Sequence, residues 1–414
     1  MTTPATPATT AEPDRSGAAS AGGGALELTL APVDTPRFFA AHWDRRPLVV
    51  DRDDPDRFVH ILGPRDVERL VCETGVRTPA FRLVKDGAQL PPADYTEDIP
   101  WRPGSFAGTA VVERVADEFS RGATLVLQGL HLHWSPAALY CRALEASLGC
   151  PVQANAYLTP STARGFAVHH DTHDVFVLQV SGRKRWRLYK PVLELPLKHQ
   201  RWSPKLDNPG APIDDLTLEA GQTLYLPRGW PHEATTSEEE SLHLTIGVHP
   251  ITRFDALRMA LDGCADDLEF RRALSPDGSL PPDLLERLAK RLGPDEVARR
   301  ARRRFVASRR PILPDQLDEL RHLDRLTRST PVERRPTVIV ELEETDGAVA
   351  LVFEGKEVRF PAKAAPAVRA IVGLGDSFTA AALPGPVDEA GRLVLVRRLV
   401  REGLLRRAGD RRGL

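Results

Sequence analysis

The segment 152–248 limits the possible folds more than any other part of the chain, because short β-rich runs alternate in it with Gly, Pro and Asp turns. The tight connection Ser181-Gly182-Arg183 predicts a hairpin between two of these runs. Several short strands at this spacing are typical of a β-barrel or a β-sandwich. Strands are predicted for residues 153–158, 174–180, 184–189, 222–226 and 242–248.

The residues before the β-rich segment suggest a tail and an elaboration of the same domain. The chain has 414 residues, which is enough for two or three domains. Residues 1–25 are rich in Ala, Thr, Pro, Gly and Ser and predict a disordered tail. Residues 26–250 are expected to form one domain, in which 34–42 predicts a helix and 47–50 a strand.

A helical module is expected over residues 251–335. Leu285, Leu288 and Leu292 recur at helical spacing and form an apolar stripe that must be buried. Pro294, followed by two acidic residues, suits the start of a helix. The stripe could pack inside the module or against a second copy of the chain.

Residues 336–414 predict a small α/β module that resembles a winged helix. Residues 338–340 and 350–353 have the composition of strands. Residues 388–402 predict a helix that ends at Gly403. The predicted order is therefore β domain, helical module and small α/β module.

Composition excludes several classes of protein. Hydrophobic residues make up 42% of the chain and charged residues 27%, which is typical of a folded globular protein. A net charge of −1 provides no overall attraction for nucleic acid or an anionic membrane. The four cysteines form no C-x-x-C pair, which fits a reducing, cytoplasmic compartment. No apolar run has the length of a spanning helix, so a soluble protein without membrane contact is expected.

A candidate metal site lies in the β-rich segment. His169 and Asp171 are two residues apart, so in a strand both side chains point the same way. His232 follows the Pro- and Gly-containing turn 227–231 and can supply a third ligand from a facing strand. Two histidines and one carboxylate on one face of a metal, with three positions open, form the facial triad of non-haem Fe(II) oxygenases.

The residue pattern alone leaves other ligand sets open. A single His-x-Asp arises by chance in many proteins, and a surface histidine beside an aspartate is usually only solvated. His170 with Asp174 could bind the metal in place of the first pair, and His173 is a further candidate.

A second candidate feature is a lysine on the inner face of a predicted strand. Lys184, Trp186 and Leu188 share one face of the run 184–189. Burying an unpaired ammonium costs several kcal/mol, so a protein carboxylate or a bound acid must meet it. The alternative is that the lysine extends to the rim and stays hydrated.

Polar residues on neighbouring strands could contact the same ligand. Asn155 and Tyr157 fall on one face of the first predicted strand, and His243 and Thr245 on one face of the last. These side chains could equally be polar groups that are satisfied within the barrel.

These motifs together resemble the ribosomal oxygenases, the cupin-like branch of the Jumonji C family. The stretch 165–187, with its His-His-Asp and Gly-Arg-Lys-Arg-Trp-Arg segments, and the stretch 221–232 are similar to the signature of that family. Phe38-Phe39, Trp43 and Pro47-Leu48 resemble its amino-terminal entry. The resemblance implies a mainly β catalytic domain with a double-stranded β-helix (cupin) fold, then an all-α dimerisation module and a small winged-helix-like domain.

The resemblance also implies an activity and roles for residues. It implies a 2-oxoglutarate-dependent dioxygenase that uses Fe(II), 2-oxoglutarate and O₂ to hydroxylate a histidyl or arginyl side chain in a ribosomal protein, and that forms a homodimer. Val168 departs from the proline that relatives often carry, which affects the local turn. The implied residues are metal ligands His169, Asp171 and His232, the cosubstrate-binding residues Lys184 and Asn155, and Tyr157 near the substrate.

Two other hypotheses remain: an oxygenase with a different substrate, and a DNA-binding regulator. The same barrel chemistry serves N-methyl-lysine demethylation and hydroxylation of a small peptide. A ligand-sensing regulator that binds DNA is a further alternative, because residues 388–414 hold eight arginines against four acidic residues. Arginine-rich helix faces are usually only solvated, so a nucleic-acid partner is not expected.

Overall fold

The computed structural model describes residues 24–161, 163, 166–236, 239–345 and 347–409. The predicted tail 1–25 therefore lies outside the described residues except for its last two, and so does Gly165 of the motif. Helix α1 (Ala25–Leu30) opens the described chain.

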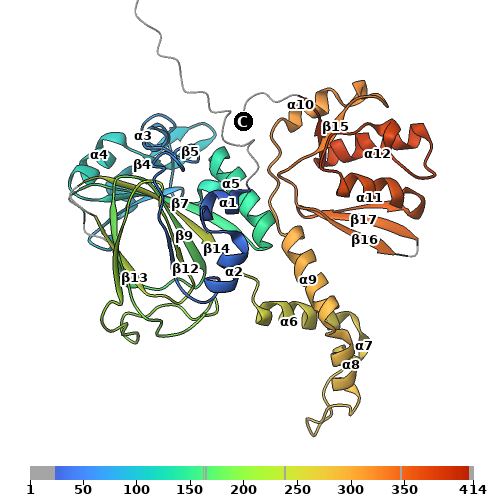
Figure 1. Cartoon of the computed structure of the whole chain (residues 1–414), viewed down its shortest axis with the longest axis horizontal. Helices are drawn as coiled ribbons and strands as arrows, with labels where there is room; N and C mark the ends of the chain where they lie inside the picture. Colours follow the sequence, from blue (N-terminus) through green and yellow to red (C-terminus); the bar gives the residue numbers. More distant parts are fainter. Residues whose placement is uncertain (1–23, 162, 164–165, 237–238, 346, 410–414) are drawn as a thin grey trace, which may run out of the picture.

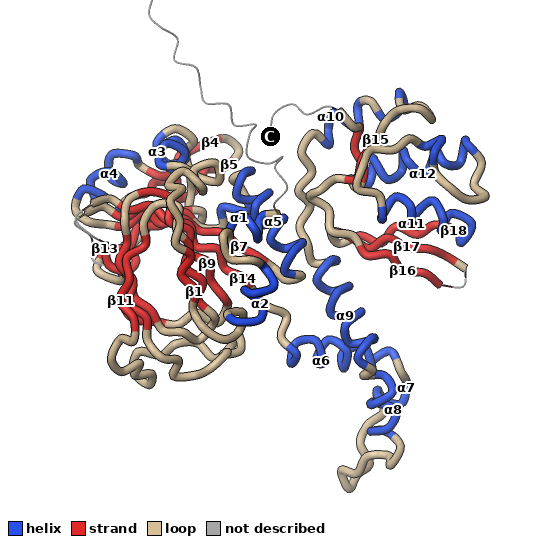
Figure 2. Tube along the Cα trace, viewed as in Figure 1, coloured by secondary structure: helices blue, strands red, loops and turns tan. Residues whose placement is uncertain are grey.

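The β-rich segment forms two antiparallel sheets that face each other (Figures 1 and 2). Apolar side chains from both sheets meet between them, among them Val177 of one sheet and Leu188 of the other. The predicted barrel or sandwich is confirmed. The larger sheet has the order β1 (Leu48–Val50), β12 (Thr223–Leu226), β9 (Asp174–Ser181), β14 (Ser241–Val248), β7 (Val152–Thr159), β6 (Thr124–Leu127), β2 (Phe81–Lys85) and β3 (Ala88–Gln89). The smaller sheet has the order β11 (Asp214–Leu218), β10 (Lys184–Leu188), β13 (His232–Thr236) and β8 (Phe166–His169).

The hairpin predicted around Gly182 is wrong. β9 pairs with β12 and β14 in the larger sheet, whereas β10 pairs with β11 and β13 in the smaller one. Gly182 has a φ of 62°, and a Cβ there would lie 1.9 Å from the carbonyl oxygen of Glu240. The tight turn thus moves the chain from one sheet to the other.

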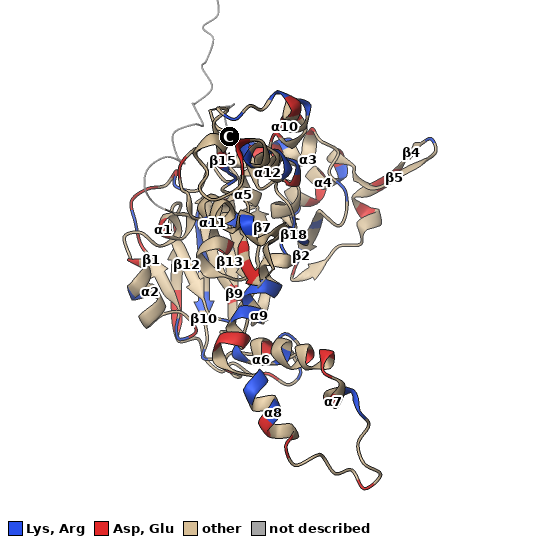
Figure 3. Ribbon diagram, turned by 90° about the vertical axis from the view of Figure 1, so that its right-hand side faces the viewer, with Lys and Arg blue, Asp and Glu red and all other residues tan. Residues whose placement is uncertain are grey.

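The outer face of the larger sheet packs on the amino-terminal helices. Leu242, Leu244 and Ile246 of β14 belong to this outer core, which leaves His243 and Thr245 on the inner face. Figure 3 shows the β4–β5 hairpin extending away from the body of the protein. The other elements of this region are α2 (Thr35–Ala41), α3 (Pro64–Cys72), β4 (Thr96–Trp101), β5 (Gly104–Ala110), α4 (Val112–Ser120) and α5 (Ser135–Leu148).

A run of helices follows the barrel and buries little apolar surface. It comprises α6 (Arg253–Asp262), α7 (Leu268–Arg271), α8 (Leu284–Arg291), α9 (Pro294–Ala307) and α10 (Gln316–Arg321). Helix α9 begins at the predicted Pro294, but Leu292 caps α8 and is not part of it. No residue of α7 or α8 is buried, and Leu285 is 64% exposed.

The carboxy-terminal part has its own core and mixes strands with helices. Helix α12 starts after its N-cap Asp388 and stops at Gly403 in the left-handed region, as predicted. The predicted strand 338–340 is wrong, because these residues are buried in the core but precede β16. The winged-helix assignment stays a prediction. The elements are β15 (Val332–Arg334), β16 (Glu341–Thr345), β17 (Ala348–Phe353), β18 (Lys356–Pro361), α11 (Ala365–Gly373), α12 (Glu389–Glu402) and β19 (Leu405–Arg407).

Short 3-10 helices connect several of these elements. The 3-10 helices are η1 (Pro92–Asp94), η2 (Leu130–Leu132), η3 (Gly263–Asp266), η4 (Leu323–Arg325), η5 (Ala362–Ala364) and η6 (Ala380–Ala382).

None of the helices in the described ranges combines the length and the apolar composition that crossing a bilayer requires.

Candidate metal and cosubstrate site

The structure brings His169, Asp171 and His232 together at one end of the barrel. His232 at the start of β13 is the direct register partner of His169 at the end of β8, and their ring centroids lie 4.7 Å apart. Asp171 follows two residues later, with Oδ2 3.9 Å from Nε2 of His232. One ligand atom from each of the three lies within 4.8 Å of the others, which is the spacing that a single metal ion requires.

Backbone carbonyls orient both imidazoles. Nδ1 of His169 is 2.9 Å from the carbonyl oxygen of Ala167, and Nδ1 of His232 is 3.0 Å from that of Trp230. A carbonyl can only accept a hydrogen bond, so each Nδ1 carries a proton, and in a neutral imidazole the lone pair then lies on Nε2. This is the tautomer that binds a metal through Nε2.

The turn between β12 and β13 holds the third residue of the cluster in place. The amide of Gly229 donates a hydrogen bond of 3.0 Å to the carbonyl oxygen of Asp171. Gly229 has a φ of 85°, and a Cβ there would lie 2.5 Å from the carbonyl oxygen of Leu193. Only glycine fits this approach, so the turn ties His232 to the Asp171 segment.

The alternative ligand residues point elsewhere. His170 is buried against Trp202, and its Nε2 is 3.3 Å from the carbonyl oxygen of Gln200. His173 stacks on His249 with a centroid distance of 4.7 Å. Asp174 accepts hydrogen bonds from Arg228, so its carboxylate is engaged away from the cluster.

Charges around the cluster favour the protonation states that bind a cation. Burial and the neighbouring His169 lower the pKa of His232 to about 4, so this imidazole is neutral. Burial alone would raise the pKa of Asp171, but the surrounding histidines outweigh it and the pKa is lowered. The neutral imidazole of His232 beside the carboxylate of Asp171 suits the binding of a cation such as Fe(II).

Lys184 lies on the inner face of β10, as the alternation predicted. It is 1% exposed, and its Nζ donates a hydrogen bond of 2.8 Å to Oγ1 of Thr159. No ion pair to Lys184 occurs among the described residues, and burial lowers its pKa to about 7. The alternative that Lys184 extends to the rim of the barrel and stays hydrated is therefore wrong. Its buried ammonium offers a binding site for an acid inside the barrel.

Aromatic and imidazole rings separate the metal cluster from Lys184. Trp186 lies 5.9 Å from His232 and 5.6 Å from His243, measured between ring centroids. His243 stacks on Tyr157 at 4.9 Å with an interplanar angle of 2°. Nε1 of Trp186 and Nδ1 of His243 are buried without a hydrogen-bond partner in the described part of the chain. A ligand between the cluster and Lys184 would therefore meet polar atoms.

Three further residues lie near the site. Asn155 was predicted from the sequence, whereas Thr159 and Arg82 were not. Oδ1 of Asn155 accepts a hydrogen bond of 2.9 Å from the amide of Gly129, so its carbonyl end holds the backbone. Thr159 continues the alternation of Asn155 and Tyr157 and could have been found from it. Arg82 of β2 hydrogen-bonds Tyr157, but no sequence pattern marked β2.

Val168 does not disturb the approach to the ligand histidine. It lies in β8, which continues to His169, and His169 keeps its register opposite His232. The departure from proline at this position is therefore compatible with the geometry of the cluster.

Comparisons with known proteins agree with the fold. A profile of the JmjC domain matches residues 130–255. The chain is 30% identical over 260 residues to Ribosomal oxygenase 1 of Gallus gallus, which covers 60% of this chain and 41% of that protein. It is 28% identical over 264 residues to "Bifunctional lysine-specific demethylase and histidyl-hydroxylase NO66" of Drosophila persimilis, covering 64% and 37%. The chain thus spans about two fifths of the length of these relatives.

Solved structures show the same fold over most of the chain. Escherichia coli ycfD superimposes with a TM-score of 0.54 and 19% identity, covering 90% of this chain and 98% of that one. A second structure of that ribosomal oxygenase, in complex with cobalt and 2-oxoglutarate, gives a TM-score of 0.52 at 19% identity and covers 91% and 99%. The barrel fold agrees with the match of residues 130–255 to the JmjC-domain profile, and over about 60% of its length the chain is similar to a ribosomal oxygenase.

Proposed function

We propose that this protein is an Fe(II)- and 2-oxoglutarate-dependent dioxygenase that hydroxylates a histidyl or arginyl side chain of a ribosomal protein. The observation that carries the proposal is the pairing, inside one barrel, of the His169, Asp171 and His232 cluster with the buried ammonium of Lys184. A metal site that leaves positions open, together with an interior cation for an acid, is what an oxo-acid-dependent oxygenase requires.

Each residue has a defined task in this proposal. His169, Asp171 and His232 hold Fe(II), which with 2-oxoglutarate and O₂ supplies the insertion of an oxygen atom into a C–H bond. Lys184 binds the distal carboxylate of the oxo acid, and Thr159 fixes the direction of its ammonium. Asn155 lines the cosubstrate pocket, while Tyr157 lies where the substrate side chain approaches.

The proposed substrate class rests on the relatives. One is named a ribosomal oxygenase and another a histidyl-hydroxylase, which supports a protein side chain as the target. A ribosomal substrate also goes with a cytoplasmic location. The DNA-binding regulator is not favoured, because the names of these relatives describe enzymes.

Demethylation of N-methyl-lysine is the second candidate. The name of the Drosophila persimilis relative includes a lysine-specific demethylase. The same oxygen insertion at an N-methyl group gives an unstable carbinolamine that releases formaldehyde, so the barrel would serve either reaction.

The helical run supports a homodimer. Phe254, Leu257 and Leu261 lie along α6 at helical spacing and are 55%, 50% and 49% exposed. Leu285 of α8 is also exposed, whereas Leu288 and Leu292 of the predicted stripe are half-buried within the chain. A second copy would bury this surface symmetrically.

Intact-mass analysis of ribosomal proteins tests the proposal. Purified proteins are incubated with the enzyme, Fe(II), ascorbate and 2-oxoglutarate, and with the Asp171→Ala variant as the matched control. Hydroxylation adds the mass of one oxygen atom to one protein in the wild-type reaction only. Loss of a methyl group with release of formaldehyde would instead assign demethylation, and no change in any ribosomal protein would reject the proposed substrate.

A further inference from the structure

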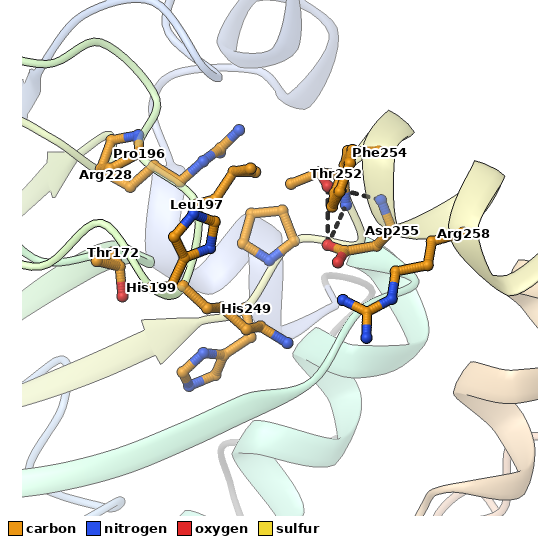
Figure 4. A pocket seen from close by; sticks show the side chains of 12 residues that line it. Thr172, Pro196, Leu197, His199, Arg228, His249, Thr252, Phe254, Asp255 and Arg258 are labelled. Atoms are coloured by element: carbon orange, nitrogen blue, oxygen red, sulfur yellow. Dashed lines mark hydrogen bonds between the residues drawn. The ribbon is translucent and has the colours of Figure 1, made fainter.

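A small cavity lies next to the candidate metal cluster, at the junction of the barrel with α6 (Figure 4). Thr172, which follows Asp171 in the chain, lines it, and so does His249 at the end of β14. Lys198 of the loop after β10 and Arg258 of α6 line it from the other elements. Its volume is about 110 Å³, which suits one side chain and is below the size of typical cofactor pockets.

Two charged residues of the cavity are already engaged within the chain. Arg228 pairs with Asp44 and, at 3.3 Å, with Asp174. The carboxylate of Asp255 accepts hydrogen bonds of 3.1 and 2.8 Å from the amide and hydroxyl of Thr252, drawn as dashed lines in Figure 4. Asp255 thereby caps α6 through Oδ2, and it lines the cavity as a carboxylate.

The exposed side chains of Lys198 and Arg258 give the cavity two further cations against the one carboxylate of Asp255. Among the described residues, neither Lys198 nor Arg258 has an ion pair or a side-chain hydrogen bond. Lys198 lies close enough to His249 that its charge, after burial and His173, contributes to lowering the pKa of that imidazole to about 4. The neutral His249 and the two cations therefore outnumber the one acid of the lining, Asp255.

The loop 189–213 suits a polypeptide as the bearer of that acid. Leu206 is 85% exposed and Ile213 47%, so the loop that contributes Lys198 to the cavity also carries exposed apolar side chains. His170, the neighbour of His169, contacts this loop through the carbonyl of Gln200. The loop is therefore tied to the segment that carries His169 and Asp171.

We propose that the cavity binds the carboxylate of an Asp or Glu residue that lies near the oxidised residue in the polypeptide substrate. The inference rests on the proposed function, since it names a determinant of substrate choice for the same site. Lys198 and Arg258 supply the charge, and Thr172 sets the distance from Asp171. An acidic neighbour of the target residue is then part of what the protein recognises.

Binding to a peptide array tests this inference without turnover. The array carries ribosomal-protein segments centred on His or Arg, with each neighbouring position replaced in turn by Glu, Gln and Lys. The full chain is applied with Mn(II) and N-oxalylglycine, an inert analogue of the oxo acid. At one or more positions Glu should strengthen binding about three- to tenfold over Gln, the range for two partly exposed ion pairs.

Charge reversal provides the matched control. Lys198→Glu/Arg258→Glu should turn the preference from Glu to Lys at the same positions. Arg65→Glu/Arg69→Glu makes the same change of net charge on α3, which lies away from α6 in Figures 1 and 3, and should keep the Glu preference. Equal binding of Glu and Gln by the wild-type chain, or an unchanged preference in the reversed variant, overturns the inference.

The two proposals fail separately. Oxygen added to a ribosomal protein together with no Glu preference would overturn the cavity assignment and leave the proposed function intact. Salt-sensitive binding of ribosomal RNA that is lost in Lys198→Glu/Arg258→Glu, without a Glu preference, would assign the cavity to phosphate and also overturn the inference.

Discussion

The ammonium of Lys184 and the hydroxyl of Thr159 lie 2.8 Å apart inside the barrel. Within the described residues, this is the one hydrogen bond that the side chain of Lys184 makes. A hydroxyl oxygen is a neutral acceptor and cannot balance a buried charge. The pKa of Lys184, lowered by burial to about 7, expresses this cost. An acid bound beside it would remove the cost, which leads to two predictions.

Lys184→Ala should raise KM for 2-oxoglutarate. A charge-assisted hydrogen bond contributes roughly 1.5 to 3 kcal/mol, which corresponds to about one to two orders of magnitude. Lys184→Arg should be partly tolerated, because the charge remains while the geometry changes. The measurement is the initial rate against 2-oxoglutarate concentration. An unchanged KM in Lys184→Ala would show that another cation holds the acid.

Binding of 2-oxoglutarate should be accompanied by proton uptake above pH 7. The pKa of Lys184 in the protein alone is about 7, so at about pH 8 the lysine is mostly neutral, and a bound carboxylate then favours the ammonium. Affinity should therefore fall as pH rises from about 7 to 9. Calorimetry with Mn(II) in buffers of different ionisation enthalpy measures the uptake. Lys184→Arg is the control and should take up no proton, because guanidinium stays charged; equal uptake in both proteins would refute the assignment.

Arg142→Ala should destabilise the fold. Arg142 of α5 is an ion pair partner of Glu145 at 2.9 Å and of Glu354, which follows β17, at 3.0 Å. All three side chains are buried, so removing the arginine leaves Glu354 without its ion-pair partner, whereas Glu145 keeps Arg309. The expected loss in the free energy of unfolding is about 3 to 5 kcal/mol, measured by chemical denaturation. Arg69→Ala on the surface of α3 is the control, and an equally small effect in both variants would contradict the prediction.

The exposed surface of α6 and α8 should make the protein dimeric. Sedimentation at micromolar concentration should give a dimer for the wild-type chain and a monomer for Leu257→Glu/Leu285→Glu, because charges oppose burial of the stripe. Val394→Glu on α12 replaces an equally exposed apolar residue and should leave the dimer unchanged. A monomeric wild-type chain with full activity would reject the homodimer.

The inner-face residues could be predicted because alternation along a strand is a local property. The prediction that Lys184 and Trp186 lie on the inner face required only a correctly placed strand and the two-residue period of its side chains. The juxtaposition of His169 with His232 followed from the same rule and the expectation of a closed barrel. Local pattern therefore located most of the candidate site.

Sheet membership could not be predicted in the same way. The turn at Gly182 looks like a hairpin in sequence, but pairing of β9 and β10 with other strands depends on contacts far along the chain. Residues 338–340 are apolar because they fill a core and not because they join a sheet. Arg82 remained unnoticed because its approach to Tyr157 depends on the fold of β2.

Metal binding by single variants tests the central claim most directly. Titration with Co(II) under anaerobic conditions should give one bound ion for the wild-type chain and no specific binding for His169→Ala, Asp171→Ala or His232→Ala, because three ligands leave none in reserve. His170→Ala should bind like the wild type, since that ring packs on Trp202. Loss of the ion in His170→Ala together with normal binding in His169→Ala would contradict the account.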